Sequence, residues 1–566
     1  MADQADFPDN YIDSSVEAGG VGSEADPYSA FSEINWTTDG DNSIFDYYAG
    51  GPAASVTINL KRGETWREFF ISGHGGDSVF PIMVNGYGEG SNPLVYGSIA
   101  GVSDAYKWTA SGSGTNEWYL EAAAGGDPGI GLPNAVWING YPCGFGSAGS
   151  LADHEFEYVD NDELGYSTVY LRDNSGDPDT SGVSIEISNN ENNAIFYLKH
   201  SYMTVDGIDC MYSNGHGFRL TGEGTNIVVK NCNPTYNFYA GIQVYNGADN
   251  CGILDCEVAY CFGTNLSVNA PYTDPVLNLR ISGCDIHDPF PYFMGGAYWE
   301  ACGIKAFGLS TSVIEKTSWY NCLSGGIRFD GTGNGEGCTN NRVAENDVYN
   351  CGGIIGQKYP QIELEFADNN TVEHNYLHDP WGGGDNIRVS HASSGTKVIN
   401  NVLTGATTGS AVTNYIEAGA SPTEIIGNSI YGCYYGISNN IEHGLVIKNN
   451  AFDGCLYANI RVGSGYSDID SNNNILGPVV NAPGFKSFRE NYTSYTLSEW
   501  KVYAGTDANS VEEDPLFTDP DNDDLSIPSG SPCVGAADNT LGSEYSVGLL
   551  DGSTWPDDVR TADRDG

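Results

Sequence analysis

Gly303-Ile304-Lys305-Ala306 and Gly326-Ile327-Arg328-Phe329 are two matching segments that lie 23 positions apart. Each segment places a cation between two apolar residues. Because successive side chains of a strand point to opposite faces, Lys305 and Arg328 are predicted to share one face and the apolar residues the other. If this spacing is one turn of a solenoid, the two cations stack on its outer wall.

Two kinds of strand recur on both sides of this pair. The first kind is β-branched and ends in Asn or Cys, and its copies, 21 to 32 residues apart, begin at Val229, Ile253, Ile281, Val313, Val343, Val372, Val398, Ile425 and Val446. The second kind follows each of these copies, as in residues 241–244, 303–306 and 386–389. A repeat of this length made of strands rather than helices predicts a β-solenoid.

The recurring Asn has a physical role at the end of the first kind of strand. Asn tolerates the left-handed backbone of a tight corner, and stacked side-chain amides can hydrogen-bond between coils. Cys232, Cys256 and Cys284 take the same position. Because a long solenoid core needs no covalent staples, we expect stacked buried thiols rather than a disulfide framework.

The two ends of the chain depart from the repeat. Residues 59–68 (NLKRGETWRE) and 82–88 (IMVNGYG) resemble the entry coils of secreted carbohydrate-active right-handed β-helix proteins, and residues 514–532 resemble their closing coils. The resemblance implies an all-β, right-handed parallel β-helix with N- and C-terminal caps. We therefore predict an N-terminal cap over residues 1–55, a β-helix with corner-loop insertions over 56–480 and capping coils over 481–566.

Acidic residues dominate the charge: 74 Asp and Glu against 23 Lys and Arg give a formal net charge of −51 over 566 residues. Such a surface repels nucleic acid and anionic membranes, so neither is expected as a partner. No run of 18 apolar residues occurs, so no membrane insertion is expected. Residues 1–6 lack the features of a signal peptide, which fits a mature extracellular form with an added Met or a chain not exported by that route. We expect an extracellular protein, and a monomer rather than a trimer.

The outward position of the second kind of strand defines a predicted column of side chains, spaced by about 4.8 Å as in any sheet. Its members are Arg219, Gln243, Ser267, Lys305, Arg328, Glu363 (or Glu365), Arg388, Glu417, Ser438 and Arg461. Cations that are scarce elsewhere in the chain are concentrated on this column. Two interpretations stay open here: a charge ladder that keeps the face soluble, and a groove for an anionic polymer.

Aromatic residues flank the same predicted face. Tyr298 and Trp299 precede Lys305, and Trp381 lies in a later corner loop. Flat rings with an apolar face suit the apolar faces of sugars. The residues predicted to bind a polysaccharide are Arg219, Gln243, Tyr298, Trp299, Glu363, Glu365, His378, Trp381, Glu417 and Arg461.

Lys305 and Arg328 on adjacent coils, with Glu300 before the lysine, resemble the catalytic arrangement of the chondroitinase-B and alginate-lyase family (polysaccharide lyase family six). The resemblance implies that Lys305 is the base that removes the proton at C5 of a uronic acid, with Arg328 as its partner. We add Arg388 to this catalytic set. The resemblance also implies Ca²⁺, held by Glu300 and Asn269, which neutralises the substrate carboxylate. Such proton abstraction needs that neutralisation and a base whose pKa neighbouring cations depress.

The leading prediction is therefore a lyase that cleaves an acidic polysaccharide by β-elimination. The alternative is a glycoside hydrolase on the same scaffold, which needs two carboxyl groups; Glu363 or Glu365, Asp330 and Glu417 are its candidates. A third interpretation is a non-catalytic glycan-binding adhesin or phage fibre. All three take a polysaccharide as partner.

Overall fold

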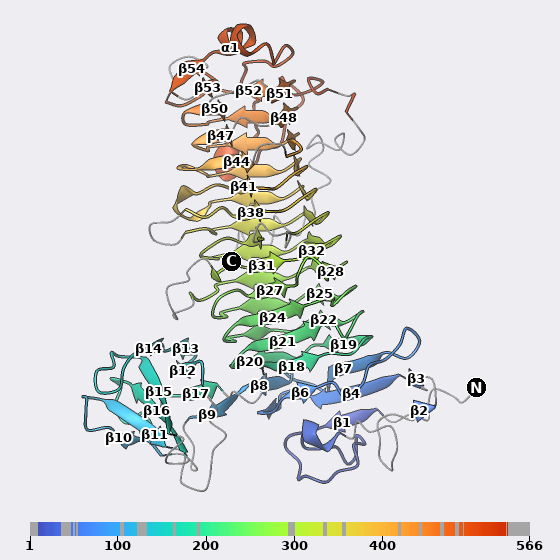
Figure 1. The fold of residues 1–566 in the computed structure, drawn as a ribbon, viewed down its shortest axis with the longest axis vertical. Coiled ribbons are helices and arrows are strands. Elements are labelled where there is room, and N and C mark those ends of the chain that lie inside the picture. Colours follow the sequence, from blue (N-terminus) through green and yellow to red (C-terminus); the bar gives the residue numbers. More distant parts are fainter. Residues whose placement is uncertain are drawn as a thin grey trace. The chain divides into compact units, whose positions relative to one another are not determined.

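The computed structural model is almost entirely β structure and divides into two compact units. The first unit is Met1–Ser267 with Pro289–Glu300, and the second is Val268–Asp288 with Ala301–Gly566. The structure describes residues 9–34, 47–48, 51–52, 55–101, 107–121, 133–161, 166–188, 193–291, 300–331, 337–353, 358–416, 420–440, 444–463, 469–481, 486–490, 492–538 and 540–541. The predicted all-β parallel solenoid is confirmed within each unit (Figure 1).

In the first unit, each coil contributes strands to three parallel sheets. The first sheet contains β1 (Asn10–Ile12), β4 (Val56–Lys61), β7 (Ile82–Tyr87), β19 (Met203–Asp206), β22 (Val228–Lys230) and β25 (Gly252–Leu254). The second contains β6 (Phe70–Ile71), β18 (Ala194–Leu198), β21 (His216–Thr221) and β24 (Ala240–Tyr245). The third contains β5 (Thr65–Trp66), β8 (Leu94–Tyr96), β20 (Asp209–Met211), β23 (Pro234–Thr235) and β26 (Glu257–Ala259).

An insertion between β8 and β18 forms two smaller sheets in the first unit. One contains β10 (Thr109–Ala110), β11 (Glu117–Glu121), β16 (Tyr166–Arg172), β15 (Glu155–Asn161) and β14 (Gly144–Phe145). The other contains β13 (Tyr141–Pro142), β12 (Val136–Ile138), β17 (Ile185–Ser188) and β9 (Ser98–Ala100). Trp108, Phe156 and Leu171 belong to the buried cluster of this insertion, so it has a core of its own.

The second unit repeats the three-sheet arrangement. Its first sheet contains β29 (Arg280–Ser282), β33 (Val313–Glu315), β36 (Arg342–Ala344), β39 (Thr371–Glu373), β42 (Lys397–Ile399), β45 (Thr423–Ile426), β48 (Leu445–Lys448) and β51 (Ile469–Asn472). Its second contains β31 (Ile304–Phe307), β35 (Ile327–Phe329), β38 (Ile362–Glu365), β41 (Ile387–His391), β44 (Ser410–Ile416), β47 (Tyr435–Asn439), β50 (Ala458–Val462), β53 (Phe488–Glu490) and antiparallel β54 (Thr493–Tyr495). Its third contains β30 (Asp285–His287), β34 (Ser318–Tyr320), β37 (Asp347–Tyr349), β40 (Tyr376–His378), β43 (Val402–Thr404), β46 (Ser429–Tyr431), β49 (Ala451–Asp453) and β52 (Ile475–Leu476).

The end of the second unit is closed by α1 (Leu497–Ala504), the one α-helix among the described residues. Thr496 and Glu499 form a capping box at its N-terminus, which satisfies backbone N–H groups that the helix leaves free. The Trp500 ring stacks on Phe488 of β53, with ring centroids 4.8 Å apart. The helix thus covers apolar residues that no further coil would bury.

A ladder of buried Asn side chains runs through the second unit, from Asn346 to Asn474. Asn401 is typical: its backbone N–H and its amide both donate to Asn428 Oδ1, at 2.9 and 3.0 Å. The prediction of stacked amides is therefore confirmed. The left-handed corner, however, belongs to the preceding residue, as in Asn400 (φ 54°), so two neighbouring positions share the two roles assigned to one Asn. All fourteen cysteines are free and only Cys533 is not fully buried, as expected.

We predict that Asn401→Ala lowers the free energy of unfolding by on the order of 2–4 kcal/mol, because it leaves buried donors and acceptors of both neighbouring coils without partners. Chemical denaturation measures this change. Asn174→Ala, at an exposed position of the insertion, is the control and is expected to change stability by less than about 0.5 kcal/mol. Equal losses in the two variants would contradict a stabilising role for the ladder.

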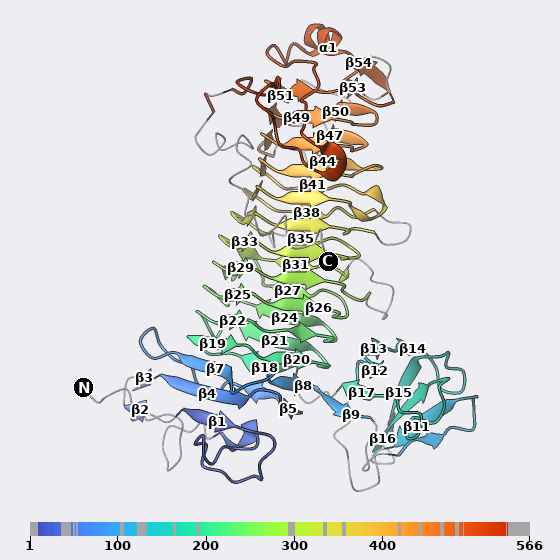
Figure 2. The same cartoon turned by 180° about the vertical axis from the view of Figure 1, so that it is seen from behind.

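A C-terminal strap, residues 513–538, packs on the outside of the third sheet of the second unit (Figure 2). Phe517 and Leu525 of the strap lie in a buried cluster with Val402 and Ala451. The Tyr431 hydroxyl donates to Asp521 Oδ1 at 2.6 Å. Val402 and Ala451 occupy outward strand positions, which face solvent on other coils. These two positions are apolar because the strap covers them.

The strap also buries an acid beside other acids. Burial raises the pKa of Asp453 to about 6, with a further contribution from Asp514 and Asp521 of the strap. A carboxyl group whose pKa is raised by folding destabilises the folded state as pH rises through that pKa.

We therefore predict that Asp453→Asn raises the free energy of unfolding near pH 8 by about 1 kcal/mol, after allowance for solvent screening. Near pH 4 the aspartic acid is protonated, and the variant and the parent are expected to unfold at the same temperature. Thermal unfolding at both pH values tests this. A stabilisation that does not depend on pH would contradict the electrostatic explanation.

Candidate functional site

A column of charged side chains lies on the outward face of the second sheet of the second unit. Lys305 pairs in register with Arg328, Arg328 with Glu363, and Glu363 with Arg388. These four residues come from β31, β35, β38 and β41. The parallel register therefore places them on consecutive coils, as predicted for this part of the column.

Lys305 and Arg328 are buried in ion pairs. Lys305 is only 7% exposed, and its Nζ lies 3.4 Å from Asp330 Oδ2. Arg328 Nε lies 3.6 Å from the same oxygen and 3.4 Å from Glu363 Oε2, and its Nη2 donates to Glu365 Oε2 at 3.1 Å. The three acids raise the pKa of Arg328, which stays fully charged.

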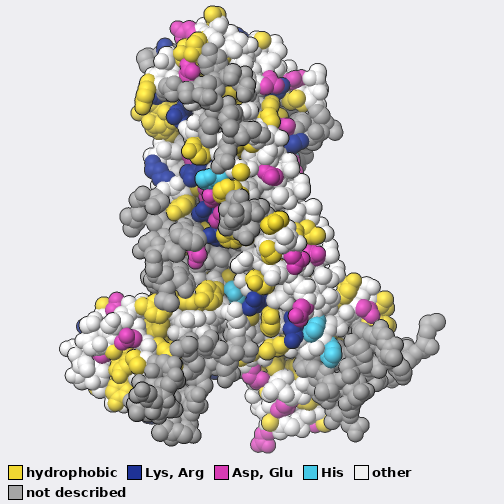
Figure 3. Space-filling view, in the orientation of Figure 1, with side chains coloured by type: hydrophobic (Ala, Val, Ile, Leu, Met, Phe, Trp, Pro, Cys, Tyr) yellow, Lys and Arg dark blue, Asp and Glu magenta, His cyan; other side chains and the backbone are white. Residues whose placement is uncertain are grey.

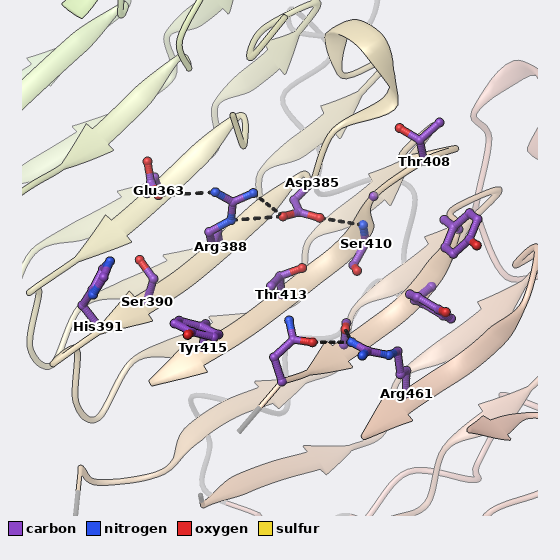
Figure 4. A pocket seen from close by; sticks show the side chains of 15 residues that line it. Glu363, Asp385, Arg388, Ser390, His391, Thr408, Ser410, Thr413, Tyr415 and Arg461 are labelled. Atoms are coloured by element: carbon purple, nitrogen blue, oxygen red, sulfur yellow. Dashed lines mark hydrogen bonds and ion pairs between the residues drawn. The ribbon is translucent and has the colours of Figure 1, made fainter. Parts of the chain in front are cut away.

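Arg388 holds two carboxylates on opposite sides of its guanidinium (Figure 4). Its Nη2 donates to Asp385 Oδ2 at 2.8 Å, and its Nη1 lies 3.7 Å from Glu363 Oε1. The other oxygen of Asp385 accepts from the backbone N–H of Ser410 at 2.8 Å. Asp385 is thus a carboxylate with three N–H contacts.

Glu363 is in a different environment from Asp385. Both residues are buried, with Glu363 6% and Asp385 8% exposed, but Glu363 Oε2 has no hydrogen bond among the described residues. Burial raises the pKa of Glu363, although the nearby guanidinium groups of Arg328 and Arg388 act against this rise. A buried carboxyl group with a raised pKa can hold a proton and later give it up.

A hollow of about 490 Å³ opens on this face of the second unit. Side chains of both charge signs gather on this face in Figure 3. The hollow is lined by Glu363, Asp385, Arg388, Ser390, His391, Thr408, Gly409, Ser410, Thr413, Tyr415, Tyr434, Tyr435, Ser438, Asn440 and Arg461. Its two acids and two arginines balance in charge, and hydroxyl groups and tyrosine rings make up much of the remainder.

The predicted site residues fall into several groups, one of which is the pair Arg219 and Gln243 on β21 and β24 of the first unit. Glu363, Arg388 and Arg461 line the hollow. Lys305, Arg328 and Glu365 belong to the ion-pair network beside Glu363. Tyr298, Trp299 and Glu417 lie outside the described residues.

The predicted alignment of the column is wrong at the position that follows Arg388. Thr413, not Glu417, pairs with Arg388, and Ser438 and Arg461 follow in register. Asn414, which is buried and donates to Asn439 Oδ1, occupies an inward position where an apolar residue was expected. The strand β44 (Ser410–Ile416) therefore begins earlier than the apolar–Glu–apolar pattern around Glu417 predicted.

His378 lies in β40 of the third sheet and does not line the hollow. Its ring stacks on Tyr349 and Tyr376, and hydrogen bonds to Asp347 and Asp379 raise its pKa to about 9, against the effect of burial. Trp381 is 41% exposed and also lies outside the lining. A role for these two residues in sugar binding stays a prediction.

The metal-binding prediction rests on Glu300 and Asn269. Glu300 is half-buried in the first unit, and Asn269 is exposed in the second. Their oxygen atoms suit Ca²⁺. Among the described residues, however, the clusters of His, Cys and acids with converging ligand atoms are Asp153–His154–Asp173 and His378–Asp379–Asp523, neither of which includes Glu300. Calcium binding stays a prediction.

The sequence reasoning missed several residues of the hollow. The most important of them is Asp385. The sequence feature that could have revealed it is an acid three residues before Arg388, just ahead of the strand that carries Arg388. His391, whose Nε2 lies 3.1 Å from Glu365 Oε1, is on the same strand as Arg388. Tyr434 and Tyr435 form an adjacent pair at a corner, which is a visible but ambiguous pattern.

Residues 235–403 match the family described as "Right handed beta helix region". Among solved structures, the chain is similar to "The complex structure of XylC with xylose", with a TM-score of 0.54 and 12% identity over 86% of each chain. It is also similar to a structure titled "Glycoside hydrolase", with a TM-score of 0.46 and 10% identity over 88% of this chain and 99% of the other.

A third similar structure is the periplasmic alginate epimerase AlgG, with a TM-score of 0.37 and 13% identity over 52% of this chain and 76% of that one. No curated protein matches the chain. The fold is that of a right-handed parallel β-helix, as predicted. Among the described residues, no helix is long and apolar enough to span a membrane.

We predict that Arg328→Met lowers the free energy of unfolding near pH 7 by about 3–5 kcal/mol, because one buried and two half-buried carboxylates lose their shared cation. Without Arg328 the pKa of Glu363 rises further, so the loss is expected to be smaller near pH 4.5, where Glu363 takes up a proton. Urea denaturation at the two pH values measures both effects.

Arg280→Met is the matched control. Arg280 is an exposed arginine that pairs with Glu315 on the first sheet, and its loss is expected to change stability by less than about 1 kcal/mol. If the two variants were equally stable, the ion-pair network would be only a surface charge ladder.

Proposed function

We propose that this protein hydrolyses a glycosidic bond of a polysaccharide in the hollow of the second unit, with Glu363 as the general acid and Asp385 as the second carboxylate. The observation that carries the proposal is the contrast between these two acids. Both are buried, line the hollow and contact Arg388, yet Glu363 has a raised pKa and an oxygen atom without a hydrogen bond among the described residues, whereas both oxygen atoms of Asp385 accept N–H donors.

Glu363 would deliver its proton to the glycosidic oxygen as the bond to the anomeric carbon breaks. Asp385 would then take the proton of an attacking water, or attack the anomeric carbon itself before water completes the reaction. Either route gives two products with free hydroxyl groups. The direct route leaves a proton on Asp385 and none on Glu363, and exchange with solvent restores both groups; in the second route the ionised Glu363 takes the proton of the water that releases the sugar from Asp385. The anomeric configuration of the first product distinguishes the two routes.

The rest of the lining supports a sugar as ligand. Tyr415, Tyr434 and Tyr435 offer rings and hydroxyl groups, and Thr408, Ser410 and Thr413 offer further hydroxyl groups. Such a surface can hydrogen-bond sugar hydroxyls while it packs on apolar faces. The structural likeness to XylC, which was solved with xylose, makes xylose-containing glycans a first substrate to test.

β-Elimination at an acidic polysaccharide is the second candidate function. Its support is the adjacency of Lys305 and Arg328 and the presence of Arg388 and Arg461 in the hollow, where they could bind a uronate. In this function Lys305 is the base. Its ion pair with Asp330 would have to open before it could accept a proton.

The two candidates differ in products and in sensitive residues. We expect Glu363→Gln and Asp385→Asn each to lower kcat by about 10²–10⁴-fold, with reducing ends as the readout on xylan, alginate, pectin and chondroitin. An aryl glycoside whose leaving group needs no proton should rescue Glu363→Gln but not Asp385→Asn. Glu373→Gln, in the first sheet, is the control that keeps full activity.

Lys305→Ala separates the lyase from the hydrolase. If the ultraviolet absorbance of an unsaturated uronate appears with the parent protein and disappears with this variant, β-elimination is the correct reaction and hydrolysis is wrong. If no glycan gives either readout, the protein is a glycan-binding protein without catalysis.

A further inference from the structure

A second cluster of polar and aromatic side chains lies on the outward face of the second sheet of the first unit. Tyr197, Arg219 and Gln243 pair in register on β18, β21 and β24. Thr221 and Tyr245 form the neighbouring outward pair on β21 and β24. Five side chains from three consecutive coils therefore share one patch, which we call the Arg219 cluster.

The guanidinium of Arg219 lies between two tyrosine rings. Its central carbon is 5.5 Å from the Tyr197 ring centroid and 5.0 Å from that of Tyr245. These cation–π contacts fix the plane of the guanidinium without using its N–H groups. The guanidinium of Arg219 is thus held in place while its N–H groups stay without acceptors among the described residues.

Arg219 differs from the arginines of the ion-pair network because, among the described residues, it has no acidic partner within 4.0 Å. Arg328 contacts three carboxylates and Arg388 two. Arg62, Arg172 and Arg461 also have no acid within 4.0 Å among the described residues, but each of them donates to a neutral oxygen atom of the protein, which Arg219 does not. Two tyrosines take the positions from which an acid could have neutralised it.

Three polar atoms of the cluster are buried without a hydrogen bond among the described residues. They are Arg219 Nε, Gln243 Oε1 and Thr221 Oγ1. Gln243 is 8% exposed and Thr221 is 7% exposed. Buried polar atoms without partners are costly, so native structures usually provide a partner, which can be a ligand.

We propose that the Arg219 cluster binds an anionic sugar residue, whose carboxylate or sulfate group accepts hydrogen bonds from Arg219. A sugar hydroxyl donates to Gln243 Oε1, and Tyr197 and Tyr245 flank the ring. The planar fork of arginine matches an oxyanion in a way that a lysine point charge does not. The site uses residues of the first unit alone and does not depend on the reaction proposed for the hollow.

The test is calorimetric titration of the full chain, carrying Glu363→Gln to slow any cleavage, with three oligosaccharides of equal length. They are an oligogalacturonate, a sulfated chondroitin fragment and a xylo-oligosaccharide. We expect one of the two anionic ligands to bind, and Arg219→Gln to weaken that binding at least about 10-fold. The anionic ligand that binds more tightly shows whether the site prefers a carboxylate or a sulfate group. Arg219→Lys should restore only part of the affinity.

Arg280→Gln and Arg461→Gln are the controls. Arg280 is an exposed arginine of another sheet, and Arg461 lines the hollow. The proposal is overturned if neither anionic ligand binds, if Arg219→Gln and Arg280→Gln bind equally well, or if only Arg461→Gln weakens binding. Tyr245→Ala keeps the charge of Arg219 and should also weaken binding. It tests the proposal independently if Arg219→Gln does not fold. Reducing-end assays on the parent protein, in which Glu363 is intact, report on the proposed hydrolysis separately.

Discussion

The apolar inner residues of each coil can be buried only by the coils before and after it, and the rest of the structure depends on this constraint. Ile304, Ile327, Ile362 and Ile387 stack in register within the second unit, and all are fully buried. A slip of one residue would turn these side chains to the solvent and bring the cations inside. The Asn ladder reinforces the same register, because each amide fits only the equivalent position of the next coil.

The same register determines the chemistry of the outer face. Stacking places outward residues about 4.8 Å apart whatever their charge, so unlike charges on successive coils become ion pairs. Glu363 lies between Arg328 and Arg388 because it is on the coil between them. The buried face desolvates its carboxyl group, and the flanking guanidinium groups compensate only in part. A buried carboxyl group with a raised pKa thus arises from the requirements of coil packing and needs no special loop.

The sequence predicts the features that recur and fails where a coil is irregular. The apolar–cation–apolar pattern was sufficient to place Lys305, Arg328 and Arg388 on one face. It misaligned Glu417, because Asn414 takes an inward position through a hydrogen bond to Asn439 that apolar periodicity cannot reveal. The third strand of each coil is only two or three residues long over most of the second unit, too short to show a period. Asp385 was missed for another reason: it lies just before the strand rather than on the outward column, and its contacts with Arg388 and with the Ser410 N–H of the next coil follow no apolar repeat.

Net charge alone does not decide which polymer this protein can hold. At physiological salt, charges separated by more than about 8 Å are largely screened, so a ligand responds to its immediate surroundings. In the hollow, Asp385 and the ionised form of Glu363 offset the charge of Arg388, and hydroxyl groups and tyrosine rings make up much of the remaining lining. In the Arg219 cluster, tyrosines replace the acids, and the local charge stays positive. A chain of charge −51 can therefore offer one site where arginine is paired with acids and another where it is not, because each arginine has different neighbours.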